Sequence, residues 1–223
     1  MKLKVISCKV FRPYTESLRN SRVSCDVTFV PMGLHADPKK MNEVLQRLVN
    51  ESQSFDGIVL LFGHCGGGTA DITTPKVPVA VMAVPDCVHA LWADCATDVY
   101  CHSAGYLENA SEVFKTNYEK AGYENHPDYP KLAEKYGADN AEVILRFGDS
   151  WKSNYKKCVY IDMGAAEDRE GKAESERIAA DFGWNHEIVS GRDDCLRAAL
   201  LFDTTSPFIR MIFPDSNEPS GVC

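Results

Sequence analysis

The thiol most suited to chemistry is Cys65, which lies in a glycine-rich run at residues 63–68. The run directly follows the apolar segment 57–62, which is typical of a strand buried on both faces. A thiol between glycines at the end of such a strand contributes little to packing. Glycines allow positive φ or a close approach of the backbone to a ligand. The candidate cofactor-binding residues are therefore Gly66, Gly67 and Gly68. The alternative is a tight turn with an incidental small hydrophobic residue.

Three more residues with metal-ligating side chains follow apolar segments that read as strands: Cys8, His35 and Cys87. In a parallel sheet the carboxyl ends of the strands share one edge, and ligands bind there. We therefore predict Cys8, Cys65 and Cys87 as metal ligands, with His35 as the fourth. Thiolate and imidazole ligands suit zinc or an iron–sulfur cluster. The alternatives are buried, inert thiols and a loop histidine that bonds to backbone.

Two further residues receive candidate catalytic roles. His64 stands beside the thiol of Cys65, where it would donate a hydrogen bond to the site or, in an enzyme without metal, act as a base. Tyr106 belongs to a polar, aromatic stretch that would cover the site. By contrast, Cys25 begins a predicted strand and should lie at the opposite edge of the sheet, so it is a natural control.

The segments that must position these side chains alternate between strand and helix patterns. This alternation favours an α/β fold with parallel, Rossmann-like sheets and flanking helices. Strands are expected at 3–8, 24–30, 55–62, 76–84, 157–162, 186–189 and 208–213. Helices are expected at 13–20, 86–96, 107–121, 130–136, 140–147, 167–182 and 192–202, with another that starts at the Asp37-Pro38 pair, a strong helix-start signal.

The pattern divides the chain into an N-terminal α/β lobe (1–101) with the Cys/His site, a helical insertion (102–150) and a C-terminal α/β lobe (151–223). Whether the two α/β parts share one sheet or form two facing lobes stays open. The final residues 214–223 are polar.

Composition narrows the classes of function. The 223 residues carry a net charge of −8, which disfavours nucleic acid and anionic membranes as partners. No apolar run approaches the ~20 residues of a membrane span, and we expect a cytoplasmic protein whose nine cysteines stay reduced. Paired Cys-x-x-Cys, His-Glu-x-x-His, Walker and Gly-x-Ser-x-Gly motifs are absent. A small-molecule substrate is expected, and a homo-oligomer is compatible with the sequence.

Several of these landmarks together resemble the domain of unknown function 1638 family. The similar stretches are Cys8, 33–35, 63–68, 86–87, 135–137, 140–142, 151–155, 160–162 and 182–184. The resemblance implies a setting rather than a reaction: anaerobic bacteria and methanogens, near genes of corrinoid-dependent methyl transfer. His64 departs from it, because an aliphatic residue is expected there.

We therefore expect a metal- or iron–sulfur-binding protein, with an enzyme of one-carbon, corrinoid-linked methyl metabolism as the leading hypothesis. Iron–sulfur is favoured slightly over zinc because of the anaerobic setting that the resemblance implies. A corrinoid protein or methyltransferase would be the partner. Two alternatives stay open: a non-catalytic metal or cofactor carrier for a methyltransferase, and a cysteine-dependent enzyme without metal. An enclosed pocket beside the thiols would favour an enzyme over a carrier.

Overall fold

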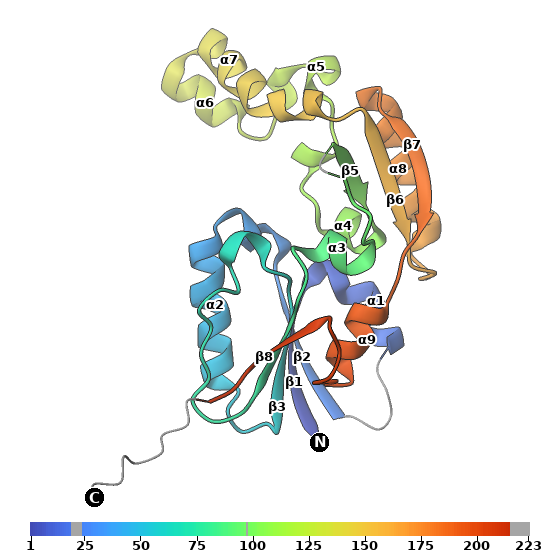
Figure 1. The fold of residues 1–223 in the computed structure, drawn as a ribbon. Coiled ribbons are helices and arrows are strands. Elements are labelled where there is room, and N and C mark those ends of the chain that lie inside the picture. Colours follow the sequence, from blue (N-terminus) through green and yellow to red (C-terminus); the bar gives the residue numbers. More distant parts are fainter. Residues whose placement is uncertain (19–23, 97, 215–223) are drawn as a thin grey trace, which may run out of the picture. The chain divides into compact units, whose positions relative to one another are not determined.

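The computed structural model describes residues 1–18, 24–96 and 98–214, which form two compact units (Figure 1). Unit 1 comprises Met1–Asp94 with Gly191–Cys223, and unit 2 comprises Cys95–Ser190. The chain thus leaves unit 1 after Asp94 and returns to it after Ser190. These boundaries differ from the three segments expected from the sequence, because the segment 151–223 contributes strands to both units.

Unit 1 is built on a sheet of five strands in the order β2-β1-β3-β4-β8. The strands are β1 (Lys2–Cys8), β2 (Ser24–Val30), β3 (Gly57–Leu61), β4 (Val79–Met82) and β8 (Ile209–Ile212). The first four are parallel, as the alternating pattern predicts, and β8 pairs antiparallel with β4 at the edge. Strand β2, which follows β1 in the chain, pairs with one side of β1, and β3, which comes next, pairs with the other side. The crevice outside the carboxyl ends of β1 and β3 is therefore the topological switch point, where open α/β sheets bind ligands.

Helices cover both faces of this sheet (Figure 1). Helix α2 (Pro38–Glu51) lies on one face, and α1 (Arg12–Leu18) and α9 (Asp194–Leu200) lie on the other. The Asp37 side chain accepts a hydrogen bond from the amide of Lys40, so the predicted start of α2 is confirmed. The stripe that α2 buries consists of Met41, Leu45 and Val49.

Unit 2 contains a parallel three-stranded sheet in the order β5-β6-β7. Its strands are β5 (Val99–His102), β6 (Lys157–Asp162) and β7 (Asn185–Ser190), and α8 (Asp168–Phe182) packs against β6 and β7. The sequence pattern missed β5, because its four residues precede a polar helical stretch. The two sheets belong to different units, so the expected α/β class is confirmed in the form of two separate sheets.

The helix expected over 107–121 is wrong as a single element. It is divided into α4 (Ala104–Asn109), a 3₁₀ turn η4 (Glu112–Phe114) and α5 (Tyr118–Ala121). Ser111 and Asn117 cause the breaks, because their side chains accept bonds from the amides two residues ahead and cap new turns. Helices α6 (Tyr129–Tyr136) and α7 (Ala138–Asp149) follow near their expected positions. Similarly, α3 (Cys87–Leu91) ends before the predicted residue 96, because Trp92 is extended.

The part of the predicted first helix that reaches residue 20, and most of the tail 214–223, lie outside the described residues. Among those described, no helix combines the length and apolar character needed to cross a membrane.

Candidate functional site

Three predicted ligands lie at the carboxyl edge of the unit 1 sheet. Cys8 is the last residue of β1, Cys65 opens a 3₁₀ turn (η3, Cys65–Gly67) after β3, and Cys87 opens α3 after β4. Strands β1, β3 and β4 are adjacent in the sheet. The thiols lie within electrostatic reach of one another, because ionised Cys8 acts on Cys65 and both act on Cys87. The fold therefore places three thiols at the ends of three adjacent strands, at one edge of the sheet.

Backbone contacts hold the loops of Cys65 and Cys87 together. The amide of His64 donates to the carbonyl of Val84 and the amide of Cys65 to that of Pro85, both at 2.8 Å. The loops approach so closely at Gly63 that a Cβ there would lie 2.7 Å from the Cα of Asp86. A glycine at this position is therefore required by the packing of one thiol loop on the other.

The turn after Gly63 is left-handed. Cys65 has φ = +46°, and it is followed by Gly66 at +66° and Gly67 at +101°. A non-glycine residue in this region is uncommon and carries strain. The thiol of Cys65 is thus fixed by a constrained backbone and not by packing in a strand, as the glycine-rich sequence predicts.

Burial keeps these thiols protonated at neutral pH. Desolvation raises the pKa of Cys8 and raises that of Cys65 to about 11. The pKa of Cys87 is raised well above its usual value, first by burial and then by the neighbouring Cys8, Cys65 and Asp86. An ionised thiolate in this cluster therefore needs a nearby cation to compensate for lost solvation and mutual repulsion.

Asp86 is the one carboxylate of the described residues that affects these pKa values, and it is already engaged. Asp86 caps α3 by accepting from the amide of His89 at 3.0 Å, and it contacts His89 Nδ1 at 2.8 Å. His89, a histidine close to Cys87 in sequence, is therefore held by Asp86. Asp86 adds negative charge near Cys65 and Cys87 and so favours a positive occupant of the thiol cluster.

The other predicted ligand and cofactor-binding residues lie as follows. His35 is exposed in the 3₁₀ turn η2 (Met32–Ala36) and forms no hydrogen bond or ion pair with another described residue. Gly66 and Gly68 lie over the N-terminal part of α2, beside Pro38 and Met41, and the Asn42 side-chain amide donates to the Gly68 carbonyl at 3.4 Å. Within the described ranges, no three His, Cys, Asp or Glu side chains are preset as a metal-binding group.

The predicted catalytic residues fall in different units. His64 is exposed in unit 1, where its side chain helps to line a groove. Tyr106 belongs to unit 2, where its hydroxyl lies 2.5 Å from that of Tyr100 and its ring stacks on His102.

The groove beside the thiol turn has a volume of about 460 Å³. Its walls are His64 and Thr69 from the glycine-rich segment, residues 82–85 at the end of β4, and Arg210 from β8. The guanidinium of Arg210 donates to the carbonyl of Thr69 at 3.1 Å, and the Thr69 hydroxyl donates to the carbonyl of Gly63 at 3.0 Å. The sequence did not single out Arg210, whose only signal was a charge inside a predicted apolar strand.

Unit 2 contains a buried polar network that sequence patterns did not reveal. The Ser175 hydroxyl lies 2.9 Å from His102 Nδ1, 3.0 Å from His186 Nε2 and 3.6 Å from the thiol of Cys158. Burial lowers the pKa of His102 to about 3 and raises that of Cys158 to about 11, so both groups are neutral at pH 7. The network joins α8 to the sheet, but it leaves the buried His102 Nε2 without a hydrogen-bond partner among the described residues.

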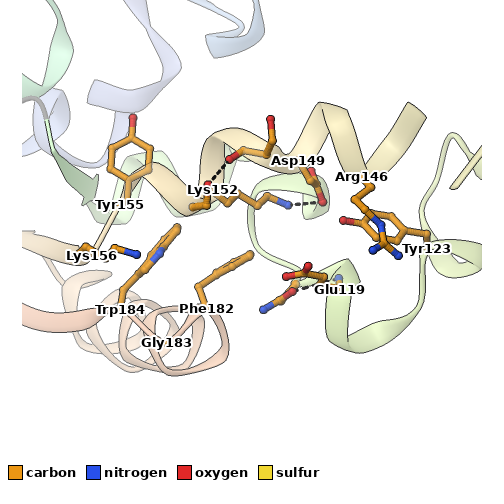
Figure 2. Close-up of a pocket in the computed structure, with 13 residues that line it drawn as sticks. Glu119, Tyr123, Arg146, Asp149, Lys152, Tyr155, Lys156, Phe182, Gly183 and Trp184 are labelled. Atoms are coloured by element: carbon orange, nitrogen blue, oxygen red, sulfur yellow. Dashed lines mark hydrogen bonds and ion pairs between the residues drawn. The ribbon is translucent and has the colours of Figure 1, made fainter. Parts of the chain in front are cut away.

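A second pocket, of about 450 Å³, lies in unit 2 (Figure 2). Phe182 and Trp184 stack with ring centroids 4.7 Å apart and form part of its wall. Figure 2 shows Lys152 directed to Asp149, and the two are joined at 2.9 Å. Arg146, which also lines the pocket, forms an ion pair with Glu142, a residue outside the pocket lining. None of the described residues that line this pocket is a cysteine or a histidine.

Fold and site together describe an α/β protein of two largely parallel sheets, with three thiols on loops at one sheet edge. The family model described as "Protein of unknown function (DUF1638)" matches residues 29–200, so the chain belongs to this family and the resemblance is confirmed. No curated protein and no solved structure matches the chain.

Proposed function

We propose that Cys8, Cys65 and Cys87 bind a thiophilic metal centre, zinc or an iron–sulfur cluster, and that the protein acts on a small molecule held in the adjoining groove. The observation that supports the proposal is that three thiols lie on separate loops at the same edge of the sheet, near enough for their charges to interact. The donor set suits either centre, since both accept three thiolates.

The electrostatics of the cluster support a cationic occupant. Three neighbouring thiols with raised pKa values are poor nucleophiles on their own, because the thiolate is the reactive form. A bound cation reverses this and deprotonates its thiol ligands. The cysteine-dependent enzyme without metal is therefore the weaker alternative.

The groove adjoins the loops of Cys65 and Cys87 but is not an enclosed pocket, and no cysteine is among its described lining residues, so the carrier remains the alternative to the proposed enzyme. The groove shares His64, Val84 and Pro85 with the two loops that hold Cys65 and Cys87, so a substrate bound there lies beside the same turn. When bound, a metal with an open position would supply Lewis-acid polarisation of that substrate. The corrinoid protein or methyltransferase implied by the family resemblance remains a proposed partner, to be tested by direct binding.

The test is anaerobic purification followed by metal and sulfide analysis and an absorption spectrum. We expect bound zinc, or iron with inorganic sulfide, in the wild-type chain. Cys65→Ala should lose the metal and Cys25→Ala should keep it, because Cys25 lies at the start of β2, at the other end of the sheet. Equal metal content in both variants would refute the ligand set.

A further inference from the structure

The described ionisable side chains that line the groove beside the thiol turn are all basic. Among the described residues that line it, Arg210 and His64 alone have ionisable side chains, and none is a carboxylate. This is unusual in a chain of net charge −8. The nearest acidic residue in sequence, Asp86, is engaged with His89. A ligand entering the groove therefore meets hydrogen-bond donors and positive charge, without a competing anion from the lining.

The Arg210 guanidinium is positioned but not neutralised. One of its nitrogens donates to the Thr69 carbonyl, and Thr69 is itself buried and bonded to the Gly63 carbonyl. Among the described residues, no carboxylate forms an ion pair with Arg210. A guanidinium has five N–H donors in a rigid fork, which matches the oxygens of a carboxylate or a phosphate. Most of this donor capacity has no partner within the part of the chain that the structure describes.

The remaining wall is apolar. Met82, Val84 and Pro85 contribute side chains at the carboxyl end of β4. Ligand sites commonly combine such apolar walls with a few polar groups that fix orientation. An occupant with an anionic head and a short apolar body therefore satisfies both parts of the groove.

We infer that the substrate of this site is a small organic anion, whose carboxylate or phosphate binds Arg210 and accepts a second hydrogen bond from His64. Its apolar part lies against Met82, Val84 and Pro85. The inference rests on the proposed function for its reaction, because it names the substrate class of the same site, but anion binding itself requires no metal.

The experiment is isothermal titration of the chelator-treated chain at fixed ionic strength with three probes: butyrate, inorganic phosphate and the neutral isostere butyramide. We expect an anion to bind and butyramide not to bind. Preference for butyrate would indicate a carboxylate substrate, and preference for phosphate a phosphate substrate. Arg210→Gln should weaken anion binding by at least about tenfold, since it removes a charge-assisted hydrogen bond, whereas Arg210→Lys should retain part of it.

Arg47→Gln is the matched control, because Arg47 is an exposed arginine on α2 that pairs with Glu51 outside the groove. It should bind the anion like the wild type. The inference is overturned if neither anion binds, if butyramide binds as tightly as butyrate, or if Arg210→Gln binds like Arg47→Gln. A parallel metal titration of the wild-type chain separates the two proposals. If the chain binds metal but no anion, only the proposed anion site in the groove is refuted. If it binds the anion but no metal, only the proposed thiol centre is refuted.

Discussion

Replacing Gly63 by alanine should separate the two loops that carry the thiols. The added Cβ would lie 2.7 Å from three backbone atoms, the Cα and N of Asp86 and the O of Val84, where ordinary contacts begin at 3.4 Å. Backbone cannot rotate away as a side chain can, so the loops must move apart by several tenths of an ångström. That movement stretches the two 2.8 Å bonds donated by His64 and Cys65.

The expected cost follows from these two effects. Overpacking costs about 1–3 kcal/mol, and each weakened hydrogen bond adds up to about 1 kcal/mol. We therefore expect Gly63→Ala to lower the free energy of unfolding by about 3 kcal/mol. Against a typical total of about 5–15 kcal/mol, the variant still folds. Its thiols should also bind zinc more weakly than those of the wild type, because Cys65 and Cys87 lie on the displaced loops.

Urea unfolding gives the stability change, and hydrogen-exchange mass spectrometry of segments 57–69 and 79–91 locates it. Gly33→Ala is the matched control, since a Cβ at Gly33 meets no heavy atom within 4 Å and its φ is not positive. The reasoning is refuted if the two variants have equal stability, equal exchange in both segments and equal zinc affinity.

Two further predictions concern unit 2. Lys152→Ala should destabilise the unit by about 3–5 kcal/mol, because it leaves Asp149 as a buried charge without its 2.9 Å partner; the exposed Lys156→Ala should change stability by less than about 0.5 kcal/mol in the same urea assay. Because burial lowers the pKa of His102 to about 3, against about 6.5 in an unfolded chain, unfolding takes up a proton as the pH falls. The contribution of this histidine to the free energy of unfolding is thus constant above pH ~6.5 and falls by about 1.4 kcal/mol per pH unit between pH ~6.5 and pH ~3. Urea unfolding measured across this pH range should show this decrease in the wild type and a smaller decrease in His102→Asn.

Local signals predicted the elements that depend on short-range chemistry. The Asp37-Pro38 pair specified the start of α2, and the apolar run before Gly63 specified the fully buried strand β3. Strand β6 (Lys157–Asp162) has the predicted bounds. Alternation of such elements was enough to predict that Cys8, Cys65 and Cys87 follow parallel strands that share one edge.

Other features depend on contacts between distant segments, which a pattern does not contain. The antiparallel pairing of β8 brings Arg210 beside Thr69, 141 positions away in sequence. The polar network around Ser175 joins residues of β5, β6, β7 and α8. Strand β5 was missed because four residues carry too little periodicity to be recognised.

The measurement that tests the thiol centre most directly is X-ray absorption spectroscopy of the zinc-loaded chain, which counts the sulfur atoms bound to the metal. We predict about three sulfur neighbours at ~2.3 Å, falling to about two in Cys87→Ser and unchanged in Cys25→Ser. A coordination sphere of nitrogen and oxygen alone, or a sulfur count that Cys87→Ser leaves unchanged, would contradict the assignment of Cys8, Cys65 and Cys87 as the ligands.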